Sequence, residues 1–129
     1  MNPVKLDKTR DTPSVFFDNN TGILTLEGRS LPENAMVFYK PLYDWIIEYA
    51  SNYKDTGITL DVDLEYLNSS SIKLVFLILN KVDEYYSETK AKDKTCINWK
   101  HKKEDELTKL KGEEFKEYLK VPLNLIAID

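Results

Sequence analysis

The sequence has few of the residues from which catalytic and metal centres are commonly built. Among its 129 residues there are one cysteine, Cys96, one histidine, His101, and four glycines. A single cysteine excludes an intrachain disulfide and suits a reducing compartment. The histidine has no nucleophile paired with it, and four scattered glycines cannot form a glycine-rich phosphate loop. No cysteine–histidine grouping has zinc spacing. We therefore expect a protein that is not an enzyme and carries no cofactor.

Long apolar runs and an excess of positive charge are also lacking. The longest apolar run, residues 74–79, is far shorter than the roughly 20 residues that span a bilayer. The first 14 residues lack the apolar core of a signal peptide. A net charge of −4 and a pI near 5.1 argue against a nucleic-acid-binding surface. These features predict a cytoplasmic protein that binds neither membranes nor nucleic acid.

Hydrophobic periodicity predicts one α/β domain over residues 13–129, preceded by a flexible N-terminal arm over residues 1–12. The expected order is β-β-α-β-α-β-α-β, because two short strands come first and strands then alternate with amphipathic helices. Asp61, Asp63 and Glu65 share one face of what should be a central strand. The expected architecture is therefore a mixed sheet of four to five strands, with about three helices mainly on one face and a partly solvated opposite face. The predicted strands cover residues 14–18, 22–28, 58–65, 94–101 and 123–129.

The most informative stretch is Asn68-Ser69-Ser70-Ser71, which joins a strand to a long apolar helix. A helix start leaves about four backbone N–H groups without partners, and Asn68 or Ser69 would satisfy some of them as an ordinary N-cap. A second interpretation adds a function. A phosphate on a first-turn hydroxyl would meet the positive end of the helix dipole, so the turn could be phosphorylated without unfolding the domain.

The helix that follows has more apolar residues than one buried stripe requires. On a helical wheel, Leu74, Ile78 and Tyr85 lie beside the core stripe rather than at its centre. Either neighbouring helices cover these side chains, or they form an exposed apolar flank that binds a protein partner. We take them as the partner-binding candidates, because a phosphate at the rim of an apolar interface would weaken it.

Two blocks of the sequence resemble the SiaC family of bacterial regulatory phosphoproteins. They are Leu31-Pro32-Glu33-Asn34 and the stretch LEYLNSSSIK at residues 64–73, and the Tyr43-Asp44-Trp45 region is also similar. The resemblance runs from about residue 12 to about residue 126. It implies a STAS-like fold, which is that of the anti-sigma-factor antagonists, and a partner-switching role.

The resemblance also implies a site and a set of partners. Members of the family are phosphorylated by a cognate Ser/Thr kinase on the hydroxyl residue directly after the asparagine of the second block, and dephosphorylated by a PP2C-type phosphatase. The implied phosphorylation site is Ser69, with Ser70 as second choice because three serines are consecutive. Unphosphorylated, the best-known kind binds and activates a diguanylate cyclase, which raises cyclic di-GMP and promotes biofilm formation. Residues expected to support the site are Asn68 and Ser71 within the turn and Glu33 and Asn34 beside it.

Three other functions are compatible with the sequence. An anti-sigma-factor antagonist would have transcription as its output. A small metal- or nucleotide-binding protein would use Asp61 and Asp63, although side chains on one strand face lie roughly 7 Å apart and converge poorly on an ion. A plain structural oligomer would keep all its interactions after a Ser69→Asp substitution.

Overall fold

The computed structural model describes residues 1–129 as one six-stranded sheet with three α-helices and a short 3₁₀ helix. The strands follow one another across the sheet in sequence order; β1, β2 and β3 are antiparallel, and β3 to β6 are parallel. The elements are β1 Val4–Leu6, β2 Ser14–Asp18, β3 Ile23–Arg29, α1 Ala35–Asn52, β4 Thr59–Glu65, α2 Ser69–Glu88, η1 Lys92–Lys94, β5 Cys96–Lys102, α3 Glu106–Glu117 and β6 Leu123–Ile128.

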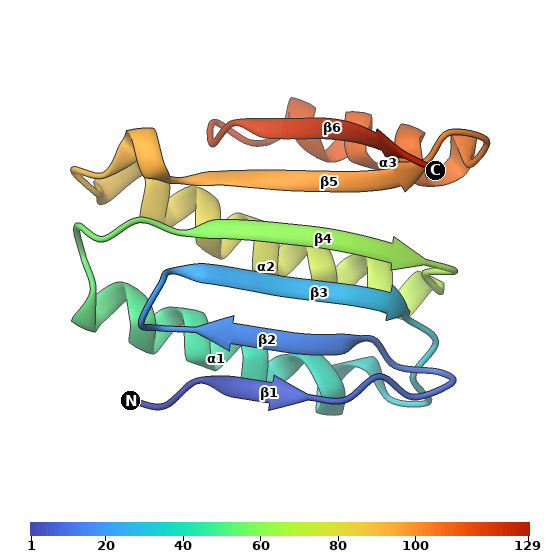
Figure 1. Cartoon of the computed structure of the whole chain (residues 1–129), viewed down its shortest axis with the longest axis horizontal. Helices are drawn as coiled ribbons and strands as arrows, with labels where there is room; N and C mark the ends of the chain where they lie inside the picture. Colours follow the sequence, from blue (N-terminus) through green and yellow to red (C-terminus); the bar gives the residue numbers. More distant parts are fainter.

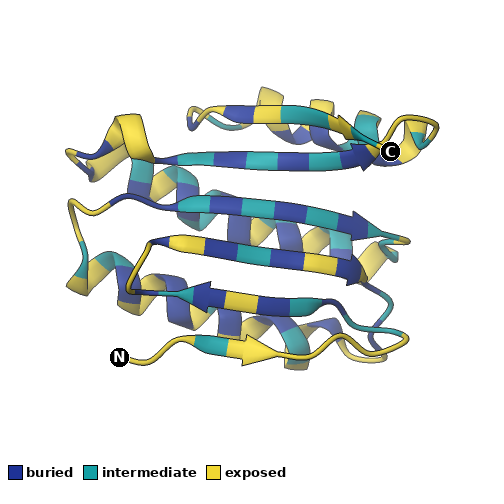
Figure 2. Cartoon of the chain, in the orientation of Figure 1, coloured by how far each residue is buried: buried dark blue, intermediate teal, exposed yellow.

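All three helices lie on one face of the sheet (Figure 1). Each parallel strand is the neighbour of the one before it, and the chain always steps in the same direction. Right-handed crossovers therefore place every connecting helix on the same side. The strands alternate between buried and more exposed residues, as Figure 2 shows, and their buried side chains face the helices. The predicted one-sided α/β architecture is confirmed.

The sheet has six strands rather than four to five, because part of the predicted flexible arm is a strand. Val4 is in register with Phe17, so β1 adds an antiparallel strand at one edge. The Trp45 indole N–H also donates to the backbone carbonyl of Asn2 at 2.9 Å. The prediction of a loosely held arm is wrong for these residues. A strand of three residues centred on Lys5 is too short to show the alternation by which strands are recognised.

Gly112 lies where α3 packs against β5 and β6. A Cβ at this position would collide with Cδ1 of Trp99 and Cδ2 of Leu125. The Trp99 indole N–H donates to the carbonyl of Thr108 on the same helix at 2.9 Å. A glycine that weakens a helix interior is therefore used here for close packing of helix on sheet. None of the three helices combines the length and apolar character needed to cross a membrane.

Candidate functional site

The serine turn, residues 68–71, follows the C-terminal end of β4 and begins α2. Asn68 is the N-cap: its side-chain Oδ1 accepts a hydrogen bond from the Ser71 N–H at 2.9 Å. The Asn68 backbone N–H donates to the carbonyl of Ser30 at 3.1 Å, which joins the turn to the end of β3. Of the two predicted caps, the structure selects Asn68. Ser69 becomes the first residue of the helix.

The three serines of the turn differ in accessibility. Ser69 and Ser70 are exposed, whereas the side chain of Ser71 is fully buried. The Ser71 hydroxyl donates to the carbonyl of Ser30 at 3.1 Å and accepts from the Ser30 hydroxyl at 2.9 Å. A kinase acting on the folded protein can therefore reach Ser69 and Ser70 but not Ser71, which instead anchors the turn.

A buried hydroxyl network continues beneath the turn into α1. The Ser30 hydroxyl is hydrogen-bonded to the Tyr39 hydroxyl at 2.5 Å, and both side chains are fully buried. Burial raises the pKa of Tyr39 to about 12, so this phenol stays protonated as a hydrogen-bonding partner. Together with Ser71, the two residues connect β3, α1 and α2. Sequence reasoning missed Ser30 and Tyr39, because contacts between residues so far apart leave no local signal.

The electrostatic surroundings of Ser69 suit an anion. Ser69 occupies the first turn of α2, where the helix dipole presents its positive end. Lys73 is exposed and lies four residues further along, which is the spacing at which an acidic group and a lysine interact on a helix. No acidic side chain occupies the first turn. A phosphate on Ser69 would be accommodated without loss of the helix.

Tyr66, two residues before the turn, is the only non-glycine residue with a positive φ, at 52°. The left-handed conformation costs a non-glycine residue about 1–2 kcal/mol. Tyr66 is nevertheless 63% exposed, and the Arg29 guanidinium lies 4.9 Å from the centroid of its ring. An aromatic side chain kept at a strained, exposed position indicates a use outside the core. The alternation of apolar and polar residues along the predicted strand did not indicate a functional position at Tyr66.

An open groove of about 810 Å³ lies beside the serine turn, between the β4–α2 connection and α3. Leu107 on its α3 side is 81% exposed, and Leu110 is 48% exposed. The charged groups around it include a Lys102–Glu65 ion pair at 3.6 Å. Its apolar lining residues are Tyr66, Leu67, Ile72, Leu107 and Leu110. The groove is thus an exposed, partly apolar surface beside the turn.

The predicted partner-binding residues do not form an exposed flank. Ile78 is fully buried and Tyr85 is 4% exposed, while Leu74 is half-buried against the core. The Tyr85 hydroxyl accepts from the Gly57 N–H at 2.8 Å and donates to the carbonyl of Tyr53 at 2.6 Å. The prediction is wrong for Ile78 and Tyr85 because α1 packs along this side of α2. A helical wheel of one helix does not show which neighbour covers it.

The residues expected beside the site lie in the β3–α1 connection, which follows the C-terminal end of β3 just as the serine turn follows that of β4. Asn34 is the N-cap of α1, and its Oδ1 accepts from the Val37 N–H at 3.2 Å. Glu33 is exposed and makes no ion pair. Asn34 thus has a structural role, and a supporting role for Glu33 stays a prediction.

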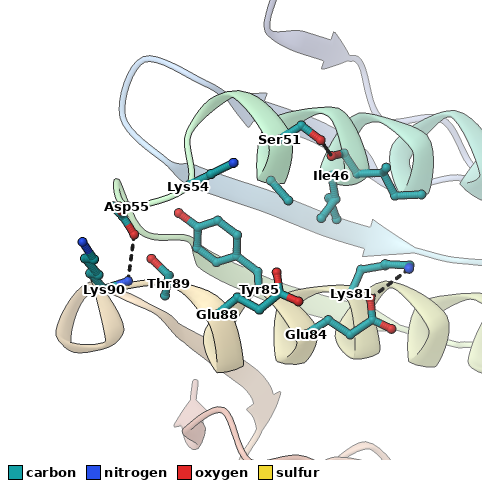
Figure 3. Close-up of a pocket in the computed structure, with 12 residues that line it drawn as sticks. Ile46, Ser51, Lys54, Asp55, Lys81, Glu84, Tyr85, Glu88, Thr89 and Lys90 are labelled. Carbon is teal, nitrogen blue, oxygen red and sulfur yellow. Dashed lines mark hydrogen bonds and ion pairs between the residues drawn. The ribbon is translucent and has the colours of Figure 1, made fainter.

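A second cleft, of about 480 Å³, lies between the C-terminal halves of α1 and α2, at the opposite end of α2 from the serine turn (Figure 3). Two of its polar contacts are internal: Lys81 pairs with Glu84 at 2.9 Å, and the Lys90 backbone N–H donates to Asp55 at 2.9 Å. Lys54 and Glu88 also line the cleft and are in no ion pair.

The acidic ladder on β4 is engaged within the sheet. Asp61 accepts from the Asn98 side-chain amide at 2.8 Å. Burial, together with repulsion from Glu27 and Glu65, raises the pKa of the Asp63 carboxyl. No three potential ligand side chains converge on one point.

Replacing Asp63 with asparagine is expected to raise the free energy of unfolding slightly at neutral pH. The raised pKa means that folding disfavours the carboxylate, so its cost appears as the pH rises above the usual carboxyl range. The gain should vanish at low pH, where the carboxyl is protonated in both states. Urea unfolding of both proteins across pH 3 to 8 measures the difference in their free energies of unfolding. A difference that does not change with pH would contradict the raised pKa of Asp63 as its cause.

Solved structures of SiaC resemble this chain over its whole length. SiaC of Pseudomonas aeruginosa superposes with a TM-score of 0.88 at 26% identity, covering 99% of this chain and 100% of that one. The SiaC chain in a crystal structure of the diguanylate cyclase SiaD with its activator SiaC, also from Pseudomonas aeruginosa, gives a TM-score of 0.87 at 27% identity. That match covers 97% of this chain and 99% of the other.

Sequence comparison gives the same result. An uncharacterised protein of Pseudomonas aeruginosa strain UCBPP-PA14 is 28% identical over 129 residues, which is all of this chain and 99% of the relative. The sequence model of the SiaC family of regulatory phosphoproteins matches residues 6–128. The resemblance carried by the Pro-Glu-Asn and Asn-Ser-Ser-Ser blocks is thereby confirmed, and the chain belongs to the SiaC family of regulatory phosphoproteins.

Proposed function

We propose that the chain is a cytoplasmic, non-enzymatic regulator that binds and activates a diguanylate cyclase while Ser69 is unmodified, and that phosphorylation of Ser69 weakens this binding. A cognate Ser/Thr kinase and a PP2C-type phosphatase would add and remove the phosphate. The proposal is supported by the related SiaC, which occurs in complex with the cyclase SiaD as its activator. The observation that carries it is the serine turn, where an exposed first-turn hydroxyl lies above a buried hydrogen-bonded anchor.

The proposed cyclase-binding surface is the groove beside the serine turn, together with Tyr66. Tyrosine is frequent among the residues that dominate binding energies, and Leu107 and Leu110 offer apolar area beside it. This surface replaces the α2 flank over Ile78 and Tyr85, which is buried.

The groove adjoins the serine turn, so a modification of Ser69 would change the charge at its rim. A phosphate carries nearly two negative charges at pH 7, and a strongly hydrated group at the edge of an apolar interface loses hydration when the partner binds. The fold would stay intact, because the phosphate lies at the positive end of α2. The switch would therefore act on binding and not on stability.

Replacing Tyr66 with glycine tests the surface. We expect cyclase binding to weaken at least about tenfold, because an exposed aromatic contact is lost. The free energy of unfolding should stay constant or rise, because glycine adopts a positive φ without the cost that tyrosine bears. Isothermal calorimetry with the purified cyclase and thermal unfolding measure the two quantities.

Leu77→Ala is the matched control, because Leu77 is also partly exposed, at 39%, but does not line the groove. It should bind the cyclase like the unmodified sequence. Equal weakening by both substitutions would contradict the placement of the surface.

The function itself is tested by titrating the purified, unphosphorylated chain into the diguanylate cyclase encoded in the same genome and measuring the rate of cyclic di-GMP synthesis. We expect a saturable rise in rate. A rate that stays constant at saturating concentrations would contradict the proposed output.

A further inference from the structure

β6 is an edge strand whose outer backbone groups have no neighbouring strand (Figure 1). The carbonyls of Pro122 and Ile128 accept hydrogen bonds from N–H groups of β5 and of the residue after it, at 2.9 and 3.0 Å. The backbone groups of alternate residues in a strand point to the same side. The N–H and C=O groups that point away from β5 therefore belong to Leu123, Leu125 and Ala127.

The two edges of the sheet differ in their protection against pairing with another chain. β1 has three residues, includes Lys5, and is followed by Asp7 and Lys8. Short, charged edge strands resist such pairing, whereas a longer uncharged one is a template for an added strand. β6 has six residues, Leu-Asn-Leu-Ile-Ala-Ile, with no charge, proline or glycine. It is therefore the edge at which an added strand would pair.

The outward groups of β6 suit pairing with a second copy of the same strand. Antiparallel pairing about a two-fold axis at Leu125 would set Leu125 opposite itself and Leu123 opposite Ala127 of the other copy. Each of these is a closely spaced hydrogen-bonded pair, so this register uses all the outward groups in about six bonds. The side chains of β6 on the open face of the sheet are uncharged, so no like charges meet there; they are Asn124, Ile126 and Ile128.

α3 lies over the β5–β6 pair, as the position of Gly112 shows: a Cβ there would collide with both Trp99 of β5 and Leu125 of β6. Neighbouring strands are about 4.8 Å apart, so the α3 axis lies about half that distance inward from β6. Two α3 helices in a β6–β6 pair would therefore be separated by about 10 Å. The axes of packed helices are about 8–10 Å apart, so the two α3 helices would contact each other without being forced apart.

The flank of α3 that faces the free edge carries charges of alternating sign. Leu107 and Leu110 face the groove beside the serine turn, on the other flank. At about 100° per residue, Lys109 and Lys116 fall opposite Leu107, whereas Glu117 points away from the sheet. Two glutamates lie within roughly 80° of these lysines, and no member of the set is in an ion pair: Glu106, Lys109, Glu113 and Lys116. Along the helix, this flank is negative, positive, negative and positive.

This order of charges is complementary to itself when one helix is reversed. In an antiparallel pair of α3 helices, Glu106 of one copy approaches Lys116 of the other. Lys109 likewise approaches Glu113, and the two-fold axis repeats each contact, which gives about four ion pairs. A second copy of this chain therefore supplies the charges that the flank requires, whereas a segment with charges of one sign does not.

Both kinds of charge contact are centred on residue 111 of α3. The pairing of β6 is centred on Leu125, whose side chain lies beside Gly112. The order of charges and the outward backbone groups therefore place the axis within about one helical residue of each other, which is about 1.5 Å. One two-fold axis satisfies both features.

We propose that the chain forms a two-fold dimer in which the β6 strands of two copies pair antiparallel and their α3 helices lie side by side. The joined sheets have β1 at both ends, so the assembly closes at two copies. The groove beside the serine turn lies on the other flank of α3 and stays open in both copies. The inference therefore does not rest on the proposed function.

Sedimentation of the full chain from about 10 µM to about 1 mM measures the dimerisation, because small interfaces associate in this range. We expect a monomer–dimer equilibrium in which the amides of Leu123, Leu125 and Ala127 become protected from hydrogen exchange as the dimer forms. Ala127→Pro removes an outward N–H and no bond to β5, so the dissociation constant should rise roughly tenfold. Ala127→Val keeps that N–H and is the matched control.

The order of charges is tested by two double variants. Lys109→Glu with Lys116→Glu makes the flank uniformly negative, and Glu106→Lys with Glu113→Lys makes it uniformly positive. Each variant alone should dimerise at least about tenfold more weakly than the original chain, because like charges then face each other. Mixed in equal amounts, the two variants should form a heterodimer, which native mass spectrometry distinguishes by its mass.

Any of four outcomes would overturn the proposal. The first three are a chain that stays monomeric at about 1 mM, equal weakening by Ala127→Pro and Ala127→Val, and a mixture of the two double variants that associates no better than either alone. The fourth is a dimer that leaves the β6 amides unprotected, because the copies would then meet through another surface.

Discussion

Ser69→Asp is expected to weaken cyclase binding more than tenfold while leaving the domain as stable as before, or stabilising it by about 0.3–1 kcal/mol. The negative charge lies at the first residue of α2, where the helix dipole favours it, and four residues before Lys73. The same charge stands between Leu67 and Ile72, which line the groove, so partner binding there would remove part of its hydration. Binding and stability should therefore change in opposite directions.

Two variants of α2 serve as controls for this substitution. Ser69→Ala removes the acceptor without adding charge and should bind the cyclase whether or not the kinase is present. Ser87→Asp places the same charge near the C-terminal end of the same helix, where the dipole disfavours it. It should lower the free energy of unfolding and leave binding unchanged. If Ser69→Asp binds the cyclase as tightly as Ser69→Ala, the switch does not act through charge at this residue.

Ile78→Ala is expected to lower the free energy of unfolding by about 2–5 kcal/mol, the range for truncating a fully buried aliphatic side chain. This is a large part of the roughly 5–15 kcal/mol that stabilises a typical domain. The lost contacts lie in the core between α2, α1 and the sheet. Urea unfolding should show a lower midpoint with an unchanged slope.

The neighbouring Leu77→Ala is the control, because Leu77 is 39% exposed and its truncation should cost much less. Folded Ile78→Ala protein should still bind the cyclase with unchanged affinity. A variant that kept its stability and lost cyclase binding would instead show that Ile78 belongs to the partner surface.

These residues show which features the sequence could and could not predict. The alternation along β4 and the cap at Asn68 are local patterns, and both appear in the structure as predicted. The burial of Ile78 and Tyr85 depends on α1, which is distant in sequence, so periodicity within α2 could not reveal it. β1 was missed for a related reason: a short edge strand is held by its pairing with β2 and by little in its own sequence.

In the candidate site, too, local features could be predicted from the sequence, whereas contacts between distant elements could not. The exposure of Ser69 and Ser70 follows from their place in the first turn, so a hydroxyl acceptor could be proposed from sequence. The anchoring of the turn through Ser30 and Tyr39 joins three separate elements and was not predictable from local pattern. The strained φ of Tyr66 could not be predicted either, because it arises in the connection where the chain leaves β4 and enters α2.

The most direct test of the central claim is to purify the chain from its native host, measure its intact mass, and map the modified peptide by fragmentation. The account predicts a population that carries the mass of one phosphate, located on Ser69, and that disappears in a Ser69→Ala strain. A phosphate located on a residue outside the exposed pair Ser69 and Ser70, or a chain that stays unmodified in the presence of its cognate kinase, would contradict it. Ser69 would then be only the first residue of a capped helix.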